Sequence, residues 1–133
     1  MNDILELFKK DVTVDDIIKN VKINNFSYLV NNISINAGYL LTSLIFKNTD
    51  QFIFYIAPNL FKANHAYDMF CHILGYENVN LYVVDELMSS ELVAVSSDLK
   101  EERLNTIKSI YTNSKKIIVT HPQAILKPLL KKE

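Results

Sequence analysis

Short apolar runs alternate with amphipathic helical stripes from residue 26 onward, and this alternation constrains the fold more than any other feature of the sequence. The apolar runs are residues 26–30, 52–57, 81–84 and 117–120. Near-continuous apolar strands are typical of parallel sheets buried on both faces, and each parallel connection needs a crossover segment, usually a helix. The sequence therefore predicts an α/β fold, with flanking helices around a parallel sheet of at least four strands.

Two of the predicted crossover helices, the one after residues 52–57 and the one before residues 117–120, have recognisable ends or faces. Asn59 is placed to begin the helix after the second strand, and Gly75 is placed to end it. The next helix begins near residue 97, and its spacing predicts that Leu104, Ile107 and Tyr111 face inward.

The first 25 residues carry two apolar stripes at helical spacing, with Thr13 as the predicted N-cap of the second helix. We expect residues 1–25 to form a helical segment that packs on an α/β domain of residues 26–133.

The composition excludes several classes of protein. With 14 Lys and Arg against 15 Asp and Glu, the chain lacks the strong positive field on which non-specific nucleic-acid binding depends. A single cysteine, Cys71, excludes an internal disulfide framework and a multi-cysteine zinc site, and it fits a reducing compartment. There is no secretory signal pattern, and the longest purely apolar run is far shorter than the roughly 20 residues of a membrane span. We expect a cytoplasmic chain without a membrane partner.

The segment between the first strand and its helix occupies the place of a phosphate-binding loop. The phosphate-loop pattern is Gly, four residues, then Gly-Lys-Ser/Thr, because the lysine contacts phosphate and the hydroxyl holds magnesium. In that frame Asn32 replaces the first glycine, Ala37 the second, Gly38 the lysine and Tyr39 the hydroxyl residue. We therefore predict a degenerate loop that does not bind nucleotide, in which Ser34 or Asn36 caps the following helix; its residues are Asn32, Ser34, Asn36, Ala37, Gly38 and Tyr39.

Asp85 and Glu86 follow an apolar strand, as the acidic residues of a Walker B strand do. Without a lysine to hold phosphates, a metal at these acids would have nothing to bridge. We interpret them as solvated acids at a strand end.

His65, Asp68 and His72 share one helix face, but histidines seven residues apart are separated by roughly 10 Å along the helix axis, too far to share one zinc. His121 could join a Ser/His/Asp triad, but the chain has no Gly-x-Ser-x-Gly motif to support one. The sequence therefore predicts neither a catalytic residue nor a metal ligand.

Four ordered segments resemble the N-terminal region of the bacterial transcription-repair coupling factors, the Mfd family: residues 54–63, 81–87, 97–104 and 117–126. The resemblance covers residues 26–130. It implies domain 1a, the first α/β subdomain of a module that is similar to the excision-repair protein UvrB and has P-loop ancestry. A decayed phosphate loop is common in that family. In this loop, the chain lacks even the glycine and the lysine of the phosphate-loop pattern that many relatives retain.

The resemblance implies that the chain is the N-terminal fragment of a longer protein and a non-catalytic scaffold within it. The module helps recruit UvrA to lesions where RNA polymerase has stalled, mainly through the domain that follows. An ATP-driven translocase lies downstream, so ATP, magnesium, DNA and polymerase belong to the parent protein, and the fragment itself contacts neighbouring domains. Two alternatives remain open: a standalone helicase-like nucleotide-binding domain, and a generic protein-interaction module.

Overall fold

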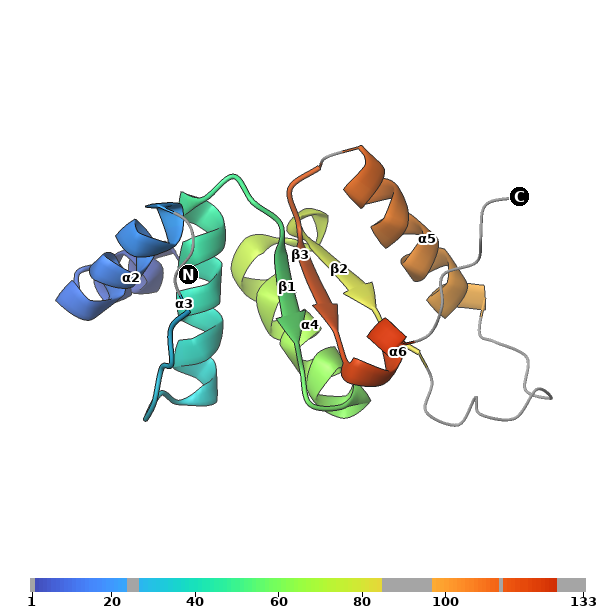
Figure 1. Ribbon diagram of the computed structural model, residues 1–133, viewed down its shortest axis with the longest axis horizontal. Helices are drawn as coiled ribbons and strands as arrows, with labels where there is room; N and C mark the ends of the chain where they lie inside the picture. The colour runs from blue at the N-terminus through green and yellow to red at the C-terminus, as the bar shows by residue number, and fades with distance from the viewer. Residues whose placement is uncertain (1, 24–26, 85–96, 113, 127–133) are drawn as a thin grey trace. The chain divides into compact units, whose positions relative to one another are not determined.

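The computed structural model describes residues 2–23, 27–84, 97–112 and 114–126, and the chain divides into two compact units (Figure 1). We call Met1–Gln51 the helical unit and Phe52–Glu133 the sheet unit. The helical unit contains α1 (Asn2–Lys9), α2 (Val12–Ile23) and α3 (Ile35–Asn48). The sheet unit contains β1 (Ile53–Ile56), α4 (Leu60–Leu74), a 3-10 turn (Tyr76–Asn78), β2 (Val79–Tyr82), α5 (Ser97–Tyr111), β3 (Ile117–Thr120) and α6 (Pro122–Leu126).

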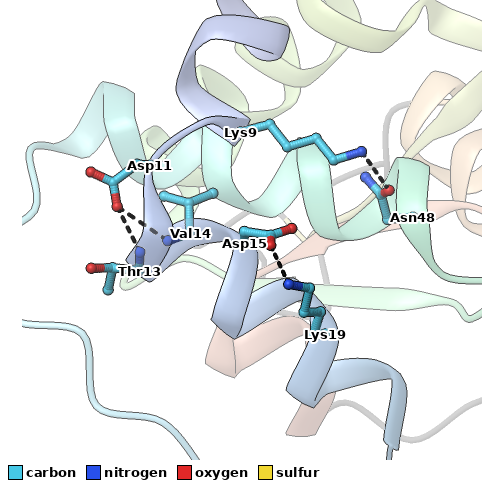
Figure 2. Close-up of polar contacts among 7 residues, drawn as sticks. All are labelled: Lys9, Asp11, Thr13, Val14, Asp15, Lys19 and Asn48. Atoms are coloured by element: carbon cyan, nitrogen blue, oxygen red, sulfur yellow. Dashed lines mark hydrogen bonds and ion pairs between the residues drawn. The ribbon is translucent and has the colours of Figure 1, made fainter.

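The helical unit is held by contacts among its three helices. Both α1 and α2 contact α3. The buried side chains of the helical unit include Leu5 of α1, Ile18 of α2 and Leu44 of α3. One polar contact joins the first helix to the end of the third, because Lys9 Nζ donates to Asn48 Oδ1 at 3.3 Å (Figure 2). The two helices expected in the first 25 residues are α1 and α2.

The start of α2 differs from the prediction. Thr13 does not cap this helix; the cap is Asp11, whose Oδ1 accepts from the backbone N–H of Thr13 at 2.9 Å and of Val14 at 3.3 Å (Figure 2). Helix α2 begins at Val12, so Thr13 is already inside its first turn. A carboxylate at the cap also opposes the partial positive charge of the helix N-terminus.

Replacing Asp11 by Ala is therefore expected to lower the free energy of unfolding by about 1 kcal/mol, since two amides at the helix start lose their acceptor. Thr13→Ala is the matched control, and it should change stability by no more than about 0.5 kcal/mol. Urea denaturation followed by circular dichroism measures both variants. A loss for Thr13→Ala that equals or exceeds the loss for Asp11→Ala contradicts this account of the cap.

The sheet is parallel, as predicted, with strand order β1-β3-β2. In the central register Val119 pairs with Tyr55 on one side and with Leu81 on the other. All four residues of β3 are buried, as the middle strand of a covered sheet requires. The described part of the chain contains three strands.

The predicted strand at residues 26–30 is wrong for the part that the structure describes, because residues 27–30 form no strand and are exposed. An apolar run becomes a strand only where another strand offers backbone hydrogen-bonding partners, and the sequence of the run does not supply them. The third predicted strand, 81–84, is β2, which runs from Val79 to Tyr82. The division into residues 1–25 and a UvrB-like domain 26–133 stays a prediction.

Helix α4 covers one face of the sheet. Its ends match the prediction: Asn59 Oδ1 accepts from the Lys62 N–H at 2.9 Å, and the chain turns away at Gly75 with φ +92°. On the sheet side, the ring of Phe70 meets the ring of Tyr55 edge-on at 5.0 Å. The helix is anchored by this aromatic contact and by buried alanines along the same face.

Helix α5 packs on the opposite face of the sheet, mainly over β2. The contact between α5 and β2 is polar. Asn80 Nδ2 of β2 donates to Ser109 Oγ of α5 at 2.9 Å, and Thr106 of α5 is buried beside the strand. The prediction that Leu104 and Tyr111 face inward is wrong, because they are 65% and 85% exposed. The spacing argument counted apolar residues only, whereas small hydroxyl residues make the close approach to the strand.

The edge strand β1 departs from the expectation of burial on both faces. Phe54 and Ile56 are 58% and 57% exposed, while Tyr55 between them turns to the α4 side. Since side chains alternate along a strand, Phe54 and Ile56 lie on the α5 side of the sheet. That helix sits over β2, so this side of β1 has little cover from the described residues.

Candidate functional site

The degenerate loop predicted from the sequence leads into α3. Residues 27–33 are irregular, and Asn32 has a left-handed backbone with φ +58°. Asparagine tolerates this conformation better than most residues. The strand–loop–helix geometry of a phosphate site is therefore not formed by the described residues here, because no strand precedes the loop.

Of the two capping residues left open by the sequence, Ser34 is the cap. Its Oγ accepts from the Ala37 N–H at 3.2 Å, and its carbonyl oxygen accepts from the Gly38 N–H at 2.9 Å. Asn36 is exposed in the first turn. The amides of Ala37 and Gly38 thus bond to Ser34, whereas a phosphate loop directs such amides at its ligand.

The two positions that matter most for phosphate and magnesium carry no suitable group. A Cβ added at Gly38 would meet nothing within 4 Å, so the packing of the described residues does not require a glycine at this position. Tyr39, in the place of the magnesium-binding hydroxyl, is 2% exposed and forms part of the core. That Asn32, Ser34, Asn36, Ala37, Gly38 and Tyr39 form a non-binding phosphate loop remains a prediction, and this geometry is consistent with it.

A buried histidine joins the strand ends at the C-terminal edge of the sheet. His121 follows β3 directly and is fully buried. Its Nε2 lies 3.3 Å from the Val84 amide nitrogen and 3.2 Å from the Val84 carbonyl oxygen. Depending on its tautomer, the ring accepts from that N–H or donates to that carbonyl. The sequence argument treated His121 only as a possible triad member; a histidine directly after an apolar strand was the available signal for this structural role.

The other polar residues considered from the sequence are the acids that follow β2 and three polar side chains on α4. Asp85 and Glu86, the Walker B-like acids, are outside the described residues. His65, Asp68 and His72 are exposed on α4, as expected of a solvated helix face. Among the residues that the structure describes, no group of three or more His, Cys, Asp or Glu side chains could hold a metal ion.

Cys71 is buried on α4, and burial raises the pKa of its thiol, only partly opposed by a hydrogen bond with Tyr67. Burial likewise raises the pKa of the Tyr67 hydroxyl to about 12. The thiolate is the nucleophilic form of cysteine, so a buried, protonated thiol is unreactive at neutral pH.

We expect Cys71 to react with an aromatic disulfide reagent at pH 8 at least about 100-fold more slowly in the folded chain than in denaturant, because reaction requires local opening. The measurement is the rate of reagent release with and without guanidinium at the same pH. Equal rates in the two conditions would show an accessible thiolate and contradict the assignment of Cys71 to the core.

The described residues thus define a three-helix unit and a three-stranded parallel α/β unit, with an irregular loop before α3. The chain is 31% identical over 130 residues, 98% of its length, to the transcription-repair-coupling factor of Bacillus subtilis (strain 168). It spans 11% of the length of that relative. This finding confirms the resemblance stated from the sequence.

Other comparisons add no further relative. No protein-family model matches the chain, and no solved structure matches it significantly. Within the described segments, no helix has both the length and the apolar character needed to cross a membrane.

Proposed function

We propose that the chain is a non-catalytic scaffold in a transcription-repair coupling factor, within a UvrB-like module that helps recruit UvrA to lesions where RNA polymerase has stalled. The observation that carries this proposal is the 31% identity over 98% of the chain to the Bacillus subtilis coupling factor. In this proposal the chain is a cytoplasmic domain 1a of P-loop ancestry. The translocase, with its ATP, magnesium and DNA, belongs to another part of the parent.

The geometry of the loop before α3 supports a role without nucleotide chemistry. The Ala37 N–H and the Gly38 N–H bond to Ser34, and the side chain of Tyr39 is buried. No lysine stands where a phosphate loop has one. A domain with this loop acts by packing against neighbouring domains and positioning them.

The test of the proposal is capture of UvrA by two proteins: the 133-residue chain alone, and the parent sequence from residue 1 through the domain that follows. We expect the extended protein to retain UvrA on an affinity column and the chain alone to retain little or none, because the contact is made mainly by the following domain. An extended protein that retains no UvrA contradicts the proposal and favours a generic interaction module.

A matched pair of variants tests the scaffold role within the extended protein. Phe70→Ala disturbs the packing of α4 on the sheet, whereas Phe61→Ala alters an exposed position on the same helix. UvrA capture should weaken several-fold with Phe70→Ala and stay unchanged with Phe61→Ala. Equal capture by both variants would show that this domain does not position the UvrA contact.

A further inference from the structure

We draw no further inference here: the strongest candidate, the exposed apolar surface patch that Phe54 and Ile56 form on the edge strand β1, carries none, because nothing in the described part of the chain shows what covers it.

Discussion

The Phe70→Ala variant is expected to lose about 3–5 kcal/mol of its free energy of unfolding, the largest effect of any single change considered. Phe70 is completely buried on α4, and its ring meets Tyr55 of β1 edge-on at 5.0 Å. Truncation removes the buried ring, leaves a cavity and abolishes the aromatic pair. Because domains of this size are stable by about 5–15 kcal/mol, this loss removes a large share of the total free energy of unfolding.

Chemical denaturation followed by far-ultraviolet circular dichroism measures this loss, with Phe61→Ala as the control on the same helix. Phe61 is exposed, so its truncation should change stability by no more than about 0.5 kcal/mol. If the two variants were equally stable, α4 would not pack on the sheet through Phe70, and the described core would be incorrect.

The second large effect is expected for His121→Ala. The substitution removes a fully buried ring and leaves a polar group of Val84 without its partner, which costs about 1–3 kcal/mol in addition to the cavity. The result should be seen as a lower denaturation midpoint with an unchanged denaturant dependence.

His121→Gln separates the hydrogen bond from the volume, because the glutamine amide can both donate and accept. We expect this variant to recover part of the stability lost in His121→Ala. If glutamine and alanine at this position gave the same stability, the bond to Val84 would contribute nothing measurable, and His121 would act through packing alone.

Local features of this fold were predictable from the sequence because their causes lie within a few residues. Ser34 and Asn59 cap helices through bonds to an amide three residues on, and Gly75 ends a helix because glycine accepts a positive φ at little cost. The strand at residues 117–120 has the predicted bounds, since it is a four-residue apolar run with both faces buried.

The sequence predictions that the structure contradicts concern features that depend on contacts with segments distant in sequence. Residues 27–30 have the composition of a strand, but pairing is decided by other segments. Leu104 and Tyr111 were expected in the core, yet α5 approaches β2 through the buried residues Thr106 and Ser109. Ser109 Oγ accepts from Asn80 of β2, whereas the Thr106 hydroxyl donates to the Glu102 carbonyl of its own helix. Apolar periodicity alone does not identify such a face.

The candidate site was predictable only in part. The missing lysine and hydroxyl of the phosphate loop are visible in the sequence, and they suffice to predict that the loop does not bind nucleotide. The burial of Tyr39 depends on helix packing and required the structure. The exposure of Phe54 and Ile56 was also hidden, because it arises where α5 packs mainly over β2.

Calorimetric titration of the chain with ATP and magnesium tests most directly whether this domain is a scaffold without nucleotide chemistry. The account predicts no saturable heat up to millimolar nucleotide, because Gly38 and Tyr39 stand in the places of the lysine and the hydroxyl residue. A micromolar dissociation constant that is lost when residues 32–39 are changed would contradict it and establish a helicase-like nucleotide-binding domain.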